Sequence, residues 1–68
     1  MSTKKLPSER KHEIVETAWK LFFKNGIANT PVSSIVKEIG VAQGLFYYYF
    51  PSKKDVIMSG IELEFEKI

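Results

Sequence analysis

The chain has 68 residues, of which 44% are hydrophobic and 26% are charged, and it contains no cysteine. A chain of this length buries only about 60% of its unfolded surface, which excludes an enzyme with a cleft between two lobes. Because there is no cysteine and one histidine, disulfides and the common zinc sites are excluded, and we expect no metal or other cofactor. No apolar run has the length of a membrane span or the form of a signal peptide, so we expect a cytoplasmic protein with no membrane partner.

The net charge of +2 is unevenly distributed along the chain. Residues 1–13 and residues 14–55 each sum to +2, whereas residues 56–68 sum to −2. A basic body suits a polyanionic partner, although an ordinary solvated surface explains so small a charge equally well. We expect residues 1–7 to form a flexible basic arm that adds nonspecific affinity for such a partner.

The first predicted element is a helix over residues 8–25. Ser8 follows a proline and can cap the helix. Apolar residues then recur at the spacing of one helical face, at Ile14, Ala18, Leu21 and Phe22. Gly26 is expected to end the helix in the left-handed conformation.

A second, shorter helix is predicted over residues 31–39. Thr30 can supply its cap, and Pro31 suits the first helical position because the N–H that proline lacks has no intrahelical partner there. Apolar residues follow with helical spacing, and Gly40 ends the helix.

The run Leu45-Phe46-Tyr47-Tyr48-Tyr49-Phe50 is stopped by Pro51. Its propensities alone favour a strand, but the chain offers no convincing second strand to pair with it. We therefore predict a helix over residues 43–49, with Leu45, Phe46, Tyr49 and Phe50 on one side and Tyr47 and Tyr48 on the other.

A last helix is expected to begin at Ser52, where Asp55 takes the place of the glutamate in a capping box. Apolar and acidic residues alternate with period two over residues 61–66, which could therefore also form a strand. Gly60 also disfavours a helix, because glycine destabilises a helix by about 1 kcal/mol relative to alanine. The apolar pattern continues to Ile68 without a capping signal, which suggests that the helix is the start of a longer one.

Two short helices joined by a tight turn at residues 40–42 form a helix-turn-helix arrangement. A second helix held out in this way fits the major groove of B-DNA, where its N-terminal residues meet base edges. These residues are Ala42, Gln43, Gly44 and Leu45. Gln43 has the donor and acceptor for reading adenine, Gly44 allows a close approach of the backbone, and Leu45 either touches a thymine methyl or belongs to the core.

The stretch from Thr30 to Val56 resembles the DNA-binding domain of TetR-type bacterial transcriptional repressors, and with the upstream helix the resemblance covers residues 8–68. The residues at the family's spacing are Gly40, Val41, Gly44, Tyr47, Phe50, Ser52 and Lys53. The resemblance implies an all-α fold, a homeodomain-like bundle of three helices with its helix-turn-helix at about 31–50, followed by the start of a long fourth helix. It also implies that residues 43–49 are the recognition helix.

The same resemblance implies that Tyr47 and Lys53 bind phosphates and that Ser33 and Ser34 contact the DNA backbone or a base. Tyr48 is as well explained by packing as by phosphate contact, and the hydroxyl of Thr30 could reach a phosphate besides capping its helix. Ala42 stands where the family usually has a polar cap, so the recognition helix lacks a side-chain cap worth about 1 kcal/mol.

Members of the family carry a larger C-terminal helical domain that binds a small-molecule inducer and forms the homodimer, and this domain is absent from the 68 residues. The expected partner of the chain itself is a double-stranded DNA operator. The alternative is a protein–protein module that docks through its aromatic cluster. An enzyme is not expected, because the sequence has no nucleophile–base pair, metal cluster or phosphate-binding loop.

Overall fold

The computed structural model describes the backbone of residues 6–66 and the side chains of residues 6–62. Within these residues the chain forms helices and no strand. The helices are α1 (Pro7–Asn25), α2 (Val32–Ile39), α3 (Gln43–Tyr49) and α4 (Lys53–Glu66). The all-α prediction is confirmed, and so is the predicted helix over residues 43–49. Residues 61–66, for which the sequence left both helix and strand open, are helical.

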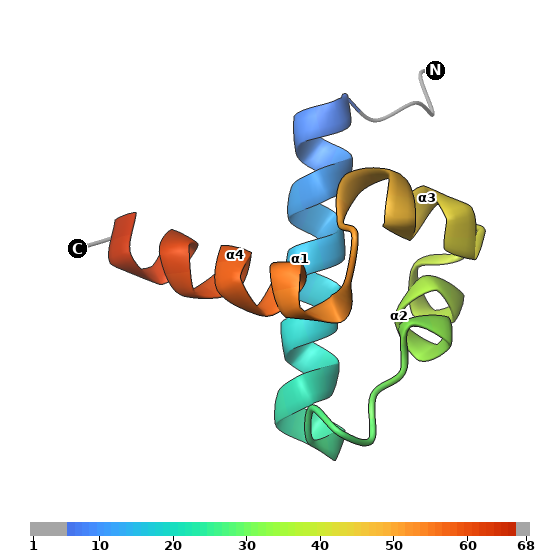
Figure 1. Ribbon diagram of the computed structural model, residues 1–68, viewed down its shortest axis with the longest axis horizontal. Helices are drawn as coiled ribbons and strands as arrows, with labels where there is room; N and C mark the ends of the chain where they lie inside the picture. The colour runs from blue at the N-terminus through green and yellow to red at the C-terminus, as the bar shows by residue number, and fades with distance from the viewer. Residues whose placement is uncertain (1–5, 67–68) are drawn as a thin grey trace.

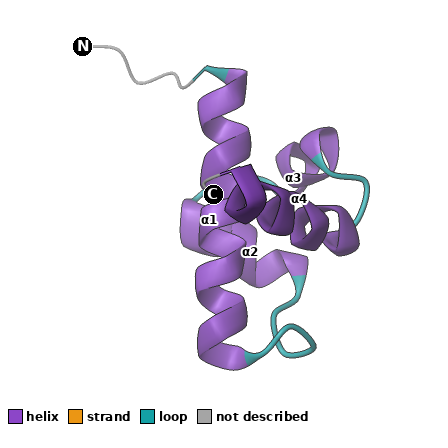
Figure 2. Cartoon of the chain, turned by 90° about the vertical axis from the view of Figure 1, so that its left-hand side faces the viewer, coloured by secondary structure: helices purple, strands orange, loops and turns teal. Residues whose placement is uncertain are grey.

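Helix α1 forms the spine of the domain, α2 and α4 pack against it, and α3 packs against α2 (Figure 1). Helix α4 crosses α1 on one side, while α2 and α3 lie on the other side of the view. Figure 2 shows α4 nearly end-on, crossing in front of α1. The buried core is formed where these elements meet, and it consists of Ile14, Val15, Ala18, Phe22, Ile35, Val36, Phe46, Phe50 and Val56.

The ends of α1 differ in detail from the prediction. The helix begins at Pro7 with Leu6 in the capping position, so Ser8 is not the cap. The N–H of Leu6 donates to the Glu9 carboxylate at 3.1 Å, which explains why the helix begins earlier. Residues 1–5 of the predicted arm lie outside the described residues, and Pro7 belongs to the helix.

Gly26 ends α1 in a different conformation from the predicted left-handed one. Its φ is 91° and its ψ is 149°, a combination that is essentially restricted to glycine. The Gly26 N–H still closes the last turn by donating to the carbonyl of Phe22 at 2.7 Å. Glycine is therefore required here for a reason that is stricter than a left-handed cap.

The predicted cap of α2 is wrong. The helix begins at Val32, Pro31 occupies the capping position, and no side chain caps it. The hydroxyl of Thr30 donates instead to the carbonyl of Gly26 at 2.8 Å, and the Thr30 side chain is fully buried. Thr30 thus closes the loop between α1 and α2, and it cannot cap α2 because Pro31 occupies the capping position.

Helix α4 begins directly after Ser52, and one half of the predicted capping box is formed, in which the Asp55 side chain binds back to Ser52. The backbone N–H and the hydroxyl of Ser52 donate to the Asp55 carboxylate at 3.1 and 2.8 Å. Farther along, α4 crosses α1 at Gly60, where an added Cβ would overlap the indole ring of Trp19. The Trp19 indole N–H also donates to the carbonyl of Val56 at 3.4 Å. The crossing of the two helices therefore depends on the absence of a side chain at residue 60.

Candidate nucleic-acid interface

The turn between α2 and α3 is closed by backbone hydrogen bonds. Gly40 ends α2 as predicted, and it does so in the left-handed conformation, with φ 87° and ψ 35°. The N–H groups of Gly40 and Val41 both donate to the carbonyl of Val36, at 2.8 and 3.0 Å. These bonds end α2 and turn the chain within three residues, so α3 starts at a defined angle to α2.

Helix α3 has an inner and an outer face, as predicted. Phe46 and Phe50 are 0% and 2% exposed, with ring centroids 5.9 Å apart. Tyr47 and Tyr48 on the other side are 47% and 79% exposed. The inner face anchors the helix in the core, and the outer face is free for a partner. A docking surface made of the whole aromatic cluster is thereby reduced to the tyrosines, because both phenylalanines are buried.

The N-terminal tip of α3 protrudes into solvent. Ala42, Gln43 and Gly44 are exposed and Leu45 is half-buried. No side chain caps the helix, as the alanine at residue 42 predicts. A Cβ added at Gly44 would meet no heavy atom within 4 Å, so packing within the described chain does not require glycine at this position.

The residues predicted to contact DNA near the start of α2 differ in solvent exposure. Ser33 is exposed and Ser34 is half-buried, so both can approach a ligand. Thr30 is 0% exposed, and its hydroxyl is occupied by the loop carbonyl described above. Thr30 therefore supports the site from behind.

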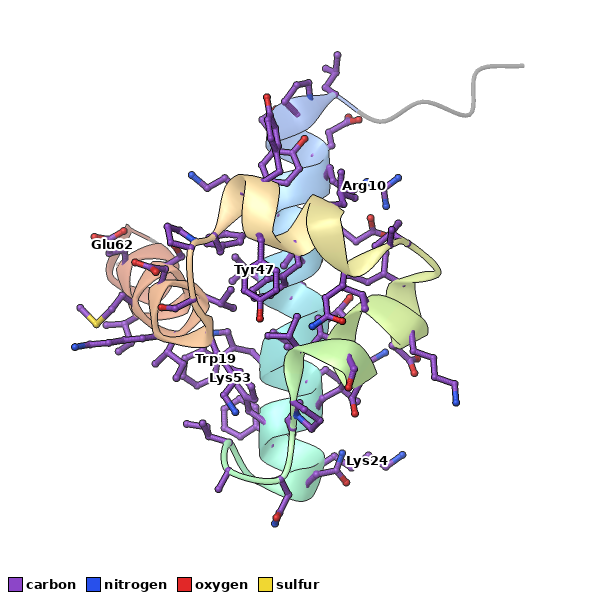
Figure 3. The ribbon with its side chains drawn as sticks, turned by 45° about the vertical axis from the view of Figure 1, so that its right-hand side comes forward. Arg10, Trp19, Lys24, Tyr47, Lys53 and Glu62 are labelled. Atoms are coloured by element: carbon purple, nitrogen blue, oxygen red, sulfur yellow. The ribbon has the colours of Figure 1, made fainter. Side chains whose placement is uncertain are left out.

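Lys53 has contacts that the sequence did not reveal. Its Nζ donates to the carbonyl of Ile27 at 2.8 Å and to the carbonyl of Thr30 at 3.1 Å. Both carbonyls belong to the loop between α1 and α2, so the first residue of α4 is bound to a segment more than 20 positions earlier. The unfavourable place of a lysine at a helix N-terminus was the available signal, but it does not name the partner. Figure 3 shows Tyr47 projecting from α3, with Lys53 below it in the view.

The electrostatic setting does not oppose an anion at this surface. No acidic residue lies in the first turn of α2 or of α3, so the partial positive charge of these helix ends is not neutralised by a side chain. The acid in the first turn of α4, Asp55, is bound by Ser52. In the part of the chain that the structure describes, no group of histidine or acidic side chains is suited to hold a metal ion. Of the described helices, none combines the length and the apolar composition that a membrane crossing requires.

Comparison with known proteins places this arrangement in a family. The family described as bacterial regulatory proteins, tetR family, matches residues 14–58, which is more than half of the chain and includes α2, α3 and the start of α4. No solved structure matches the chain closely enough to be counted as similar.

Several curated bacterial proteins are similar over most of the chain. An uncharacterized HTH-type transcriptional regulator of Bacillus subtilis, YuxN, is 41% identical over 87% of this chain and 20% of its own length. The HTH-type transcriptional regulator HbdR of an Aromatoleum strain is 42% identical over 78% of this chain and 23% of its own. For the regulator TtgR of Pseudomonas putida the identity is 32%, over 84% of this chain and 27% of its own. The chain thus spans about a quarter or less of these relatives.

Proposed function

Because the chain belongs to the tetR family of bacterial regulatory proteins and carries its helix-turn-helix DNA-binding domain, we propose that it binds an operator by inserting the tip of α3 into the major groove. The observation that carries the proposal is the exposed tip itself. It protrudes from a helix whose other face is anchored by Phe46. An α-helix fits the major groove, and the N-terminal residues of a recognition helix reach the base edges.

Base reading is assigned to the tip residues. The Gln43 amide presents a donor and an acceptor together and suits the two adjacent groups of adenine. Leu45 is half-buried, so only part of its side chain is available for a thymine methyl. Ala42 and Gly44 add little bulk, which lets the backbone approach the bases.

Phosphate contacts are assigned to the residues around the tip. Tyr47 and Tyr48 are exposed on the outer face of α3, and Ser33 is exposed at the start of α2. Ser34, which is half-buried, contributes where its hydroxyl is accessible. Such contacts fix the orientation of a protein on the duplex but carry no sequence information. Two of the three N–H donors of Lys53 are occupied by loop carbonyls, so one remains for a phosphate. Thr30 acts only through the loop that it stabilises.

At the level of the whole regulator, we propose a cytoplasmic repressor that binds as a homodimer and responds to a small-molecule inducer. The dimer contacts and the inducer site would lie in chain beyond these 68 residues, as the greater length of the relatives allows. An inducer that changes the spacing of two α3 helices would lower the affinity for two half-sites about one helical turn apart.

The test is selection of bound sequences from a random duplex pool by the full-length protein, followed by affinity measurements for Gln43→Ala. This substitution should cost about 1–3 kcal/mol at one base pair and leave the preference at the others unchanged. Lys24→Ala is the control, because Lys24 lies at the far end of α1 from α3 (Figure 3), and it should keep the wild-type preference at every base pair. Equal loss on all sequences would remove Gln43 from base reading, and no binding at low salt would reject the proposal.

A further inference from the structure

We propose that Lys53 is a positioning residue that clasps the two ends of the helix-turn-helix segment together. Lys53 is the first residue of α4, and it directly follows the segment formed by residues 31–52. Its Nζ donates to the carbonyl of Thr30, the residue directly before that segment, and to the carbonyl of Ile27. One side chain therefore joins the chain just before α2 to the chain just after α3.

The loop that Lys53 binds is built to present these carbonyls. The Thr30 side chain points inward, with its hydroxyl on the carbonyls of Gly26 at 2.8 Å and Leu21 at 3.4 Å. The Thr30 N–H donates to the Ile27 carbonyl at 3.2 Å, so these residues form one turn. The Lys53 ammonium group lies on the outer side of this turn and donates to both carbonyls.

The clasp also explains the place of a cation at the start of α4. A positive charge at a helix N-terminus is disfavoured by the helix dipole. Here the ammonium group lies on two carbonyl oxygens of the loop that follows α1, and hydrogen bonds from a charged donor are stronger than those between neutral groups. The favourable contact is therefore with the loop and is present before any DNA is bound.

The consequence for DNA binding rests on the function proposed above. Helix α3 reaches the duplex from a base formed by α2 and the turn after it, and the N-terminal end of α2 continues directly from the clasped loop. Loosening the loop would let α2 and α3 move relative to α4. The entropy cost of ordering these helices would then reduce the free energy of DNA binding. Lys53 would thus support affinity even without touching a phosphate.

The decisive experiment measures amide hydrogen exchange in residues 26–36 of the full-length protein without DNA. Lys53→Met keeps the aliphatic stem and removes the donors, and we expect exchange in this segment to become about tenfold faster or more. Lys54→Met is the matched control, because it removes the same charge from the next position, where the side chain is exposed, and it should leave exchange unchanged. Lys53→Arg restores charged donors and should recover most of the protection.

Lys53→Gln keeps N–H donors on a shorter side chain and replaces the methionine variant if that protein does not fold, with the same acceleration expected. Wild-type exchange in both neutral variants would overturn the clasp.

The salt dependence of DNA binding then separates a positioning role of Lys53 from a phosphate contact. Faster exchange with an unchanged slope would assign Lys53 to the clasp alone. Faster exchange with a slope lower by about one would support the clasp and show that the third donor of Lys53 also contacts a phosphate. A lower slope with wild-type exchange would assign Lys53 to phosphate alone and overturn the proposal. Failure of the wild-type protein to bind DNA would reject only the proposed function, since exchange is measured without DNA.

Discussion

The surroundings of two glycines, Gly44 in α3 and Gly60 in α4, are opposite. Both lie inside a helix, where glycine costs about 1 kcal/mol relative to alanine, and neither has the positive φ of Gly26 and Gly40. At Gly60 an added Cβ would overlap Trp19, whereas at Gly44 it would meet no atom within 4 Å. Packing within the described chain therefore explains the glycine at residue 60 but not the glycine at residue 44.

This difference separates a structural contact from a surface prepared for a partner. Gly60 lets α4 lie close to α1, so its glycine contributes to the stability of the domain. Gly44 lies on the exposed tip of α3, where a missing side chain matters only to something that approaches from outside. A duplex whose bases are reached by this tip is such a partner. Substitutions at these two positions should therefore affect different properties.

The largest effect is expected for Gly60→Ala. The new methyl group forces Trp19 or the whole of α4 to move, and this overpacking, less the gain in helix propensity, should lower the free energy of unfolding by about 2 kcal/mol. Urea denaturation followed by far-UV circular dichroism measures the change. In a Trp19→Phe background, where the ring is smaller, the same substitution should cost less. An equal cost in both backgrounds would show that Trp19 does not set the distance between α1 and α4.

The second effect is expected for Gly44→Ala, with opposite signs for stability and binding. Stability should rise by up to about 1 kcal/mol, because the backbone is helical and the added methyl group has room. DNA affinity should fall by about tenfold, since overpacking a close contact costs roughly 1–3 kcal/mol. Denaturation and operator binding are measured on the same preparation. Unchanged affinity would show that the duplex does not approach the backbone at residue 44, and the contrast with Gly60 would then lose its functional meaning.

Local signals in the sequence were sufficient to predict the helices and the faces of α3. Gly40 and Pro51 mark the limits within which α3 forms, and the predicted range 43–49 is the observed one. The spacing of Phe46 and Phe50 identified the buried face. These features depend on residues within one or two turns of each other, so a linear pattern contains them.

Contacts between distant segments were not predictable in the same way. The Lys53 bonds span 26 and 23 positions, and the Trp19 bond to the Val56 carbonyl spans 37. Their acceptors are backbone carbonyls, which every residue has, so no residue type marks them in the sequence. Thr30 failed as a predicted cap for a related reason, since the helix begins one residue later than predicted and the loop geometry directs the Thr30 hydroxyl to the Gly26 carbonyl. The helical scaffold of the site could therefore be predicted, but the bonds that set its orientation could not.

The smallest effect is expected for Ala42→Ser. This substitution tests whether a side-chain cap stabilises α3, whereas Gly44→Ala tests the room for a partner at the same tip. Ala42 already has the extended conformation of a capping residue, with φ −75° and ψ 151° and no side-chain cap. A serine hydroxyl there can accept a free N–H of the first turn, which should raise the free energy of unfolding by about 1 kcal/mol. Ala28→Ser is the control, because residue 28 is exposed in the α1–α2 loop and caps no helix, so no gain is expected. Equal gains in the two variants would mean that the hydroxyl acts through solvation rather than through capping.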